Sequence, residues 1–329
     1  MQPEVVCLGA VNLDLLYRVE DLTPFREVWP LLRPGGELAL AAEEEAQLAA
    51  LLARYGEPGG RSGGGQAANT AFALAKMGIS AALVGRVGED EDGDFLRAEM
   101  AGVDLSHLRR AGRSGRAYVL VDSAGERTIF VAPHTNDELR EEDVPLEVLA
   151  GASYVHFTSF VGPGPLKVQT SLTARLKAGG GEGRPFLTLD PGELYARRGR
   201  EALAGLLAAA DILLVTEAEW QALGGEPHRR PEWAPPLILL KRGAHGARAI
   251  LAGGWQDFPA PQTAAVDTLG AGDVFAAGFL AGRLRGLPLA KAVMLAVRAA
   301  SASVAGRGRE AYPDAAFLRE QVERLGGGE

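Results

Sequence analysis

The pattern of apolar and polar positions is most regular in the second half of the chain. Apolar runs typical of buried strands lie at about 153–157, 185–190, 211–215 and 236–241. Helical periodicity predicts helices at about 165–178, 199–209, 217–223, 271–285, 288–305 and 314–325. The alternation of strands and helices favours a mostly parallel sheet with helices on both faces. We therefore expect a single α/β domain over residues 1–329.

The first half of the chain is less regular. Strands are predicted at Val5–Ala10 and Ala81–Gly85, and helices at Glu43–Tyr55, about Gln66–Met77 and Asp92–Met100. Apolar runs at 117–122 and 127–132 flank the turn 123–126 and predict a β-hairpin, and 247–251 with 255–258 predict a second one. Residues 20–42 are predicted to be irregular. We expect the segments 15–42 and 113–135 to form a small β lid on the α/β domain.

Composition excludes several classes of protein. Hydrophobic residues make up 47% and charged residues 23% of the chain, which is typical of a globular domain with a sizeable core. The net charge of −8 lacks the basic footprint of a nucleic-acid binder, so a phosphate compound must be bound locally. The single cysteine, Cys7, excludes a disulfide framework. No apolar run approaches the roughly 18 residues of a membrane span, so we expect a cytoplasmic protein.

The strongest local signal is the segment Asp267-Thr268-Leu269-Gly270-Ala271-Gly272-Asp273. It joins the end of an apolar strand to a long apolar helix, where glycines and a helix N-terminus can form an anion hole. A carboxylate at Asp273 would repel a bound phosphate, but it suits a general base that takes a proton from an attacking hydroxyl. The alternative is an acidic residue that merely stabilises the first helical turn.

Two further segments carry candidate chemistry. Gly63-Gly64-Gly65-Gln66-Ala67-Ala68-Asn69 enters a helix, and its glycines would let backbone approach a small polar ligand while Asn69 offers an amide. The spacing also fits a dinucleotide-binding variant, but no acidic residue follows the next strand to hold a ribose. Asn12 and Asp14 follow the first strand, where a carboxylate could accept hydrogen bonds from vicinal sugar hydroxyls or simply form an Asx-turn.

Taken together, these three segments resemble the ribokinase or PfkB family of carbohydrate kinases from about residue 4 to residue 320. The resemblance implies a ribokinase-like fold and phosphoryl transfer from ATP, with Mg²⁺, to a sugar-type hydroxyl. Asp273 would be the general base, and Gly270, Ala271 and Gly272 the anion hole. The substrate would be held by Asn12, Asp14, Gly64, Gly65 and Asn69, with Arg116 and Tyr118 contributed by the lid hairpin.

The resemblance also implies a nucleotide site. The family has Asn-x-x-Glu where this chain has Thr216-Glu217-Ala218-Glu219, so Glu219 would organise the magnesium waters while Thr216 departs from the pattern. Other residues expected beside the nucleotide are Lys241, Gly243, Thr268 and Gly308. Some members need a monovalent cation such as K⁺, and Asp267 with Leu269 could supply part of that site.

The resemblance leaves the substrate open between a free sugar and a nucleoside. Gln66 stands where many ribokinase-like members carry Lys, and the long segment 21–63 resembles the layout of adenosine kinases. Phe157 and Phe160 could stack on a base or belong to the core. Two remote alternatives are a nicotinamide-dependent oxidoreductase and a non-catalytic sugar-binding homologue. The hairpins offer exposed edges, so a homodimer through the lid is a further expectation.

Overall fold

A nine-stranded sheet forms the centre of the protein. In the computed structural model, residues 2–179 and 183–326 are described, so the predicted single domain is described apart from residues 1, 180–182 and 327–329. The strands of the large sheet are β14 (Gly254–Phe258), β13 (Ala247–Leu251), β12 (Leu237–Lys241), β11 (Ile212–Thr216), β10 (Phe186–Asp190), β9 (Tyr154–Thr158), β1 (Val5–Leu8), β5 (Ala81–Val87) and β6 (Leu108–Arg110), in spatial order. The pairs from β12 to β6 are parallel, and β13 and β14 form an antiparallel edge, so the expected mostly parallel sheet is confirmed.

Helices cover both faces of this sheet because its buried strands are apolar on both sides. Val5 and Cys7 of β1 pack into one apolar cluster, and Val6 and Leu8 pack into the other. The first face carries α3 (Gln66–Lys76), α4 (Glu91–Ala98), α11 (Ala271–Leu284), α12 (Leu289–Ser303) and α13 (Ala315–Gly326). The second carries α5 (Leu146–Gly151), α6 (Pro163–Ala178), α7 (Gly192–Ala196), α9 (Ala204–Ala209) and α10 (Glu217–Ala222). The predicted helix at 199–209 is interrupted at Leu203, which separates α8 (Gly199–Ala202) from α9.

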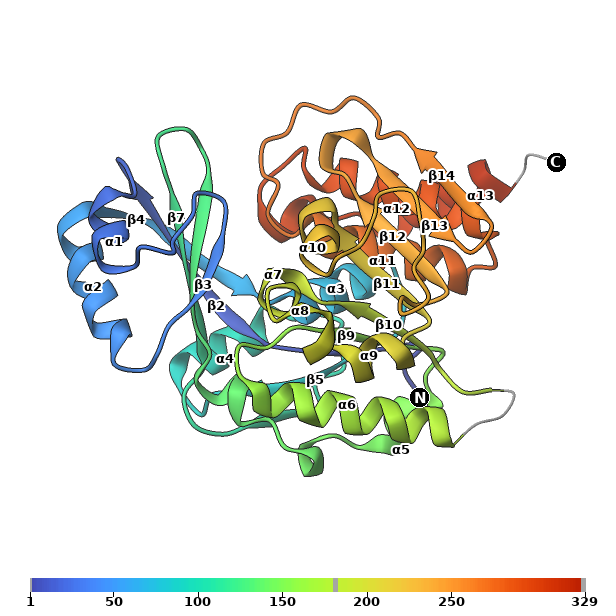
Figure 1. Cartoon of the computed structure of the whole chain (residues 1–329), viewed down its shortest axis with the longest axis horizontal. Coiled ribbons are helices and arrows are strands. Elements are labelled where there is room, and N and C mark those ends of the chain that lie inside the picture. The colour runs from blue at the N-terminus through green and yellow to red at the C-terminus, as the bar shows by residue number, and fades with distance from the viewer. Residues whose placement is uncertain (1, 180–182, 327–329) are drawn as a thin grey trace.

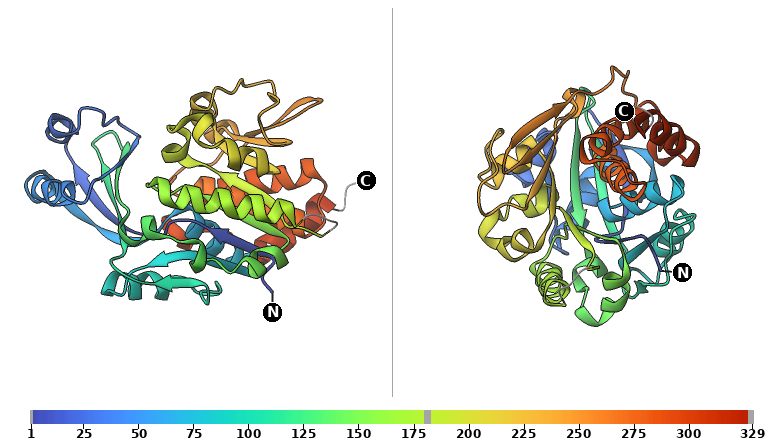
Figure 2. Two further views of the ribbon diagram at one scale, coloured as in Figure 1. Left: turned by 60° about the horizontal axis from the view of Figure 1, so that its bottom comes forward. Right: turned by 90° about the vertical axis from the view of Figure 1, so that its right-hand side faces the viewer.

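A second, five-stranded sheet projects from one side of the large sheet, as Figures 1 and 2 show. Its strands are β3 (Glu37–Ala39), β8 (Arg127–Ala132), β7 (Gly115–Val121), β2 (Asn12–Val19) and β4 (Gly56–Gly64), in spatial order. Its outer face is covered by α1 (Thr23–Val28) and α2 (Glu44–Tyr55) through an apolar cluster that includes Phe25, Trp29, Leu48 and Phe130. We refer to this sheet with α1 and α2 as the lid.

The lid is larger than the sequence pattern predicts. Asn12 and Asp14 lie within β2 rather than in a loop after the first strand, and the glycine-rich segment is the edge strand β4. Part of the segment predicted to be irregular forms α1 and β3. Glycine and proline are rare in strands, so the sequence of β4 gives no strand signal. Pairing with β2 supplies the backbone hydrogen bonds that hold it in place.

Four short 3₁₀ turns complete the described structure: η1 (His134–Glu138), η2 (Glu141–Asp143), η3 (Gly243–His245) and η4 (Gly308–Ala311). Within the described residues, no helix has the length and apolarity to cross a membrane. In the large sheet, β1 lies between β5 and β9, and the chain leaves it for β2 of the lid. Ligands of parallel α/β sheets bind at such a reversal of strand order, beyond the carboxyl ends of the strands.

Candidate active site

Two cavities meet at the N-terminus of α11. The lid cavity, of about 290 Å³, lies between the inner face of the lid and the carboxyl ends of the large sheet. The second cavity, of about 490 Å³, lies between η3, the segment 260–268 and helices α11 and α12. Gly270 and Asp273 border the lid cavity, whereas Ala271 and Gly272 border the second cavity. The predicted anion hole and base therefore stand at the boundary between the two spaces.

Glycine at position 270 is required by the turn that starts α11. Gly270 has φ +75°, a left-handed conformation, and a Cβ at this position would overlap the hydroxyl of Tyr312. The turn begins a 14-residue helix whose first residues, Ala271 and Gly272, border the second cavity. The positive end of the helix dipole adds to the peptide N–H donors of this first turn, so this end of α11 can hold an anion.

Asp273 is a buried carboxyl with one fixed hydrogen bond. It is 7% exposed, and its Oδ2 accepts a hydrogen bond of 2.8 Å from Nδ2 of Asn69. Burial raises the pKa of Asp273 to about 7, and the nearby carboxylate of Asp190 acts in the same direction. The Asn69 hydrogen bond and the charges of Lys241 and Arg309 oppose this rise. A carboxyl with a pKa near 7 is suited to general base catalysis at neutral pH.

The glycines of the segment 63–65 make room for the protein's own groups. A Cβ on Gly64 would overlap the carboxylate of Asp14, and Gly65 has φ +96° with its α-carbon against the carbonyl of Ala10. A Cβ on Gly63 would come within 2.9 Å of Nη1 of Arg309. Gly65 borders the lid cavity, whereas Gly64 lies behind Asp14. These contacts also argue against a dinucleotide-binding loop, because Gly63 and Gly64 belong to β4, which is paired with β2.

Three polar residues predicted to hold the substrate come together at the lid cavity. Asn12, Asp14 and Asn69 all border it. Oδ1 of Asn12 accepts a hydrogen bond of 2.9 Å from Asn136, which fixes its orientation. Asp14 is 7% exposed, and burial raises its pKa to about 7 while the charge of Arg309 opposes the rise. Phe160, also predicted, borders the cavity from the core.

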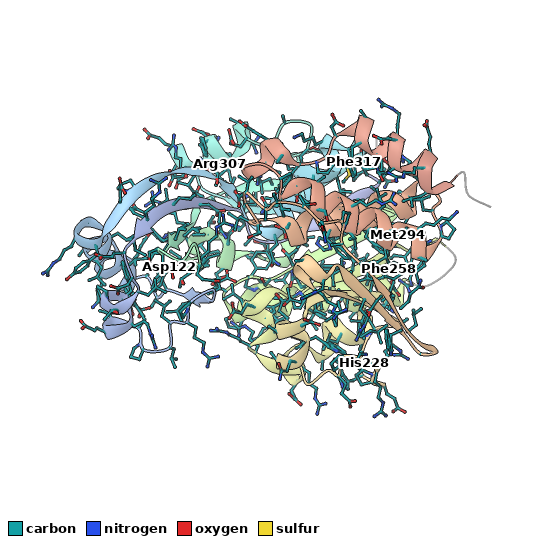
Figure 3. The ribbon with its side chains drawn as sticks, turned by 90° about the horizontal axis from the view of Figure 1, so that it is seen from above. Asp122, His228, Phe258, Met294, Arg307 and Phe317 are labelled. Carbon is teal, nitrogen blue, oxygen red and sulfur yellow. The ribbon has the colours of Figure 1, made fainter. Side chains whose placement is uncertain are left out.

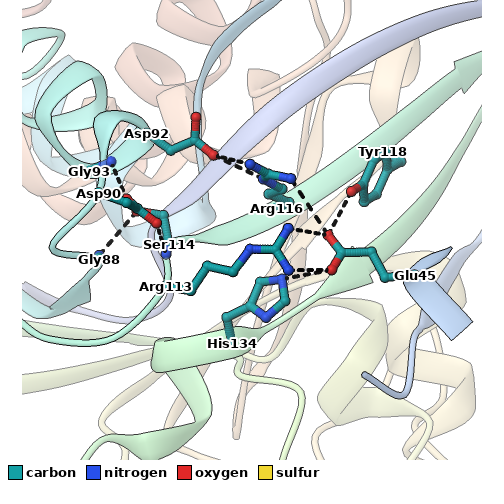
Figure 4. Close-up of polar contacts among 10 residues, drawn as sticks. All are labelled: Glu45, Gly88, Asp90, Asp92, Gly93, Arg113, Ser114, Arg116, Tyr118 and His134. Atoms are coloured by element: carbon teal, nitrogen blue, oxygen red, sulfur yellow. Dashed lines mark hydrogen bonds and ion pairs between the residues drawn. The ribbon is translucent and has the colours of Figure 1, made fainter. Parts of the chain in front are cut away.

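The structure does not bring Arg116 and Tyr118 to the lid cavity. Both point to the opposite face of β7, where Tyr118 donates a 2.6 Å hydrogen bond to Glu45 of α2 and Arg116 pairs with Asp92 (Figure 4). Side chains alternate along a strand, and the sequence cannot say which face a covering helix will take. The cavity wall is instead formed by alternating aliphatic residues of the lid: Ala117, Val119, Ile129 and Val131.

The residues predicted for the nucleotide and metal divide into two groups. Lys241, Gly243 and Thr268 border the second cavity. Glu219 borders the lid cavity, where its Oε2 accepts a 2.8 Å hydrogen bond from the backbone N–H of Thr216, and Thr216 caps α10 in return. Gly308 borders neither cavity, and its N–H donates a hydrogen bond to Asp267.

Asp267 does not present an open ligand for a monovalent cation. Its Oδ1 pairs with Nη2 of Arg127 at 2.7 Å and accepts a hydrogen bond from the N–H of Leu269. Its Oδ2 accepts from the N–H of Gly308 at 3.1 Å. Three donors therefore share this carboxylate, and one of them, Arg127, comes from the lid. This pair ties the lid to the segment that carries the anion hole.

The sequence interpretation missed four residues of the site. Glu37 of β3 and Glu193 of α7 border the lid cavity, and the backbone N–H of Glu37 donates to Glu193. Burial and the neighbouring carboxylates of Glu193, Glu219 and Asp14 raise the pKa of Glu37 to about 8. Asp190, at the end of β10, pairs with Lys241 at 2.5 Å. Of these three residues, only Asp190 could have been singled out from the sequence, because a carboxyl side chain there directly follows the apolar run of a predicted strand.

Arg309 is the fourth missed residue, and it contacts Asn69, which borders the lid cavity. Its Nε and Nη2 donate to Oδ1 of Asn69 at 3.1 and 2.9 Å. The charged stretch at 307–310 signals an unusual loop in the sequence, but not its contact with Asn69, which lies 240 positions away.

Comparisons with known proteins agree with this geometry. Residues 44–314 match the family described as pfkB family carbohydrate kinase. An ATP-dependent ribose-1-phosphate kinase from Halopiger xanaduensis is 33% identical over 97% of this chain and 99% of its own length. A fructokinase from Klebsiella pneumoniae is 34% identical over 67% of this chain and 76% of its own. The crystal structure of adenosine kinase from Sinorhizobium meliloti superposes with a TM-score of 0.83 at 22% identity, covering 98% of this chain and all of that one.

The family match spans most of the chain, and the first relative spans nearly all of it. The fold that the resemblance implied is confirmed by the structural neighbour. The sequence left open an oxidoreductase and a non-catalytic homologue. The relatives are named as kinases, so they support a phosphotransferase instead. The chain, with the buried carboxyl group of Asp273 at the start of α11, therefore belongs to the pfkB family of carbohydrate kinases.

Proposed function

We propose that this enzyme transfers the γ-phosphoryl group of ATP to a hydroxyl of a small, unphosphorylated sugar held in the lid cavity. The observation that carries the proposal is the position of Asp273, buried at the N-terminus of α11 between a polar cavity and a second, more apolar one. An acceptor on one side and a nucleotide on the other would meet at this residue.

In the proposed reaction, the acceptor hydroxyl gives its proton to the Asp273 carboxylate and its oxygen attacks the γ-phosphorus. The bond to the β,γ-bridging oxygen breaks, and ADP leaves with those electrons. The peptide N–H groups of Gly270, Ala271 and Gly272 would stabilise negative charge on the transferring group. Lys241 is held near them by Asp190; burial alone would lower its pKa, but the carboxylates of Asp190 and Glu219 raise it, so it stays charged.

The second cavity suits the nucleotide. Its walls combine apolar side chains, such as Phe275, Val297 and Val304, with the backbone of Gly243 and the hydroxyl of Thr268. An adenine needs such apolar walls, while its phosphates need the N–H groups at the start of α11. Mg²⁺ would be held through water by Glu219, whose carboxylate is anchored by Thr216 and lies beside the Asp190–Lys241 pair. Bound there, the metal would neutralise charge on the phosphates.

The charge of the lid cavity supports an unphosphorylated acceptor. Five carboxyl side chains border it, those of Asp14, Glu37, Glu193, Glu219 and Asp273. Among the described residues, no Lys, Arg or His borders the same cavity. Carboxylates accept hydrogen bonds from sugar hydroxyls, but they repel a phosphate monoester. The relative named as a fructokinase is consistent with a free sugar.

A nucleoside is the second candidate, favoured by one observation. The aliphatic wall from the lid, formed by Ala117, Val119, Ile129 and Val131, could lie against the flat face of a base. Because α1 and α2 cover the outer face of the lid sheet, its edge strands β3 and β4 are the parts that could pair in a homodimer through the lid.

An ADP-release assay with a panel of acceptors tests the proposal. The panel contains ribose, fructose, adenosine, cytidine and ribose-1-phosphate, each with the wild type and with an Asp273→Asn control for contaminating kinases. We expect the highest kcat/KM with a free sugar and the lowest with ribose-1-phosphate. A preference for ribose-1-phosphate would overturn the unphosphorylated acceptor, and a preference for adenosine or cytidine would favour the nucleoside candidate.

A further inference from the structure

Arg309 reaches the site from a part of the chain remote from the other residues of the lid cavity. It lies in η4, and the cavity itself does not include it. Its guanidinium stands 5.1 Å from the ring centre of Phe72 and donates to Sδ of Met100 at 3.3 Å. Its own carbonyl accepts a 3.1 Å hydrogen bond from Lys76 of α3. The residue is thus held at both ends, and the absence of a side chain at Gly63 makes room for it.

The contact between Arg309 and Asn69 settles how the Asn69 amide is oriented. An arginine has only donors, so the two hydrogen bonds from Nε and Nη2 must end on the amide oxygen of Asn69. The amide nitrogen is then turned to Asp273, to which it donates at 2.8 Å. Because Nδ2 can only donate, the Asp273 oxygen must accept, as an ionised carboxylate does.

We propose that Arg309 is a positioning residue that acts on Asp273 through Asn69, locking the amide in the orientation that favours an ionised, correctly aimed base. The proposal rests on the proposed function, in which Asp273 is the base. Two charge-assisted donors on the amide oxygen also polarise the amide and strengthen its N–H as a donor. Without them, the amide can rotate and present its oxygen, which pairs only with a protonated Asp273.

A substitution of Arg309 would leave the other charged or titratable groups around Asp273 unchanged in the sequence. They come from several elements and are Asp190 of β10, Lys241 of β12, Cys7 of β1 and Tyr312 after η4. Burial raises the pKa of both Cys7 and Tyr312, so neither gains charge near neutral pH. A change in the titration of Asp273 can therefore be assigned to Arg309, which acts through its own charge and through Asn69.

The pH dependence of kcat at saturating acceptor and ATP tests the proposal. In Arg309→Met we expect the acidic limb to move up by about one pH unit, which is a roughly tenfold loss at pH 6. The rates of variant and wild type should converge above pH 9, where Asp273 is ionised in both. Arg309→Lys, which keeps the charge but loses the paired donors, should lie between them. Arg307→Met is the matched control, because Arg307 is exposed in the same segment (Figure 3).

A double-mutant cycle separates this proposal from a general effect on folding. In an Asn69→Ala background, Arg309→Met should cause a clearly smaller further loss than the roughly tenfold loss expected in the wild-type background, because only the direct effect of the Arg309 charge on Asp273 then remains. Equal losses at every pH, or full additivity with Asn69→Ala, would overturn the role of Arg309 while leaving Asp273 as the base. Substantial turnover by Asp273→Asn would instead overturn the proposed function itself.

Discussion

Replacing Asp273 by Asn removes the proposed base while keeping the shape of the site. The carbonyl oxygen of the new amide can accept the hydrogen bond that Asn69 now donates at 2.8 Å, so the local packing should survive. What is lost is the carboxylate that, in the proposed reaction, accepts the proton of the attacking hydroxyl. General base catalysis contributes about 10²–10⁴ in rate, so kcat should fall by at least about a hundredfold. The KM for ATP should change little, because the nucleotide is expected in the second cavity.

The same substitution should stabilise the protein at alkaline pH. Burial raises the folded-state pKa of Asp273 from 3.8 to about 7, so the folded protein holds this proton more tightly than the unfolded chain. With respect to this group, stability is greatest below about pH 4 and declines as the pH rises toward 7. The full shift corresponds to roughly 4 kcal/mol above pH 7. Asn does not ionise, and we expect Asp273→Asn to recover at least about 1 kcal/mol of this at pH 8.

Two measurements check this prediction on the same preparation. Single-turnover and steady-state kinetics give the loss in kcat, and urea unfolding at pH 8 and pH 4 gives the free energy of unfolding. We expect a loss of activity with a gain in stability at pH 8, and a smaller gain at pH 4. A variant that keeps more than a tenth of wild-type kcat would remove Asp273 from the role of base. An inactive variant that is less stable at pH 8 would refute the reasoning about its burial.

Three further predictions concern the rest of the site. Asp14→Ala should raise the KM for the acceptor about tenfold or more, because sugar hydroxyls lose a hydrogen-bond partner. Gly64→Ala should have the same effect, because the new side chain would displace Asp14. For both variants, isothermal titration should show unchanged binding of ATP. Arg127→Ala breaks the ion pair with Asp267, so hydrogen exchange in the β7–β8 hairpin should become faster. Addition of the acceptor should slow this exchange, whereas addition of nucleotide alone should not. Exchange that is equally slow with and without acceptor would contradict a moving lid. Glu219→Gln should raise the Mg²⁺ concentration needed for half-maximal rate several-fold, and an unchanged metal dependence would exclude Glu219 from the metal site.

The sequence predicts most of the large sheet because its strands are buried on both faces. Continuous apolar runs such as Leu213-Leu214-Val215 are buried when helices cover both faces of a parallel sheet. Each segment between two such runs is long enough for one crossover helix. The lid resists prediction for the opposite reason. The strand β4 is nearly devoid of apolar side chains, and its conformation is imposed by pairing with β2 rather than by its own residues.

The predicted site residues follow the same division. Asp273 lies in the first turn of α11, after a glycine turn that the sequence itself encodes, and Asn69 of α3 and Asp14 of β2 come to the same cavity. Tyr118 could not be placed, because either face of its strand could have been the inner one until α2 covered one of them. Arg309 could not be found at all, since its role depends on a contact with a helix 240 positions earlier in the chain.

The glycines of the segment 63–65 show why a motif can be found without being understood. From the sequence they are interpreted as space for a ligand, yet each contacts a part of the protein itself: Gly63 the guanidinium of Arg309, Gly64 the carboxylate of Asp14, and Gly65 the carbonyl of Ala10. Two of these three partners are charged groups that border or support the lid cavity. We therefore expect the glycines to act on a substrate indirectly. They allow a buried cation and a buried carboxyl group to lie close together, so that the charge of Arg309 opposes the rise in the pKa of Asp14 that burial causes, and favours its charged form.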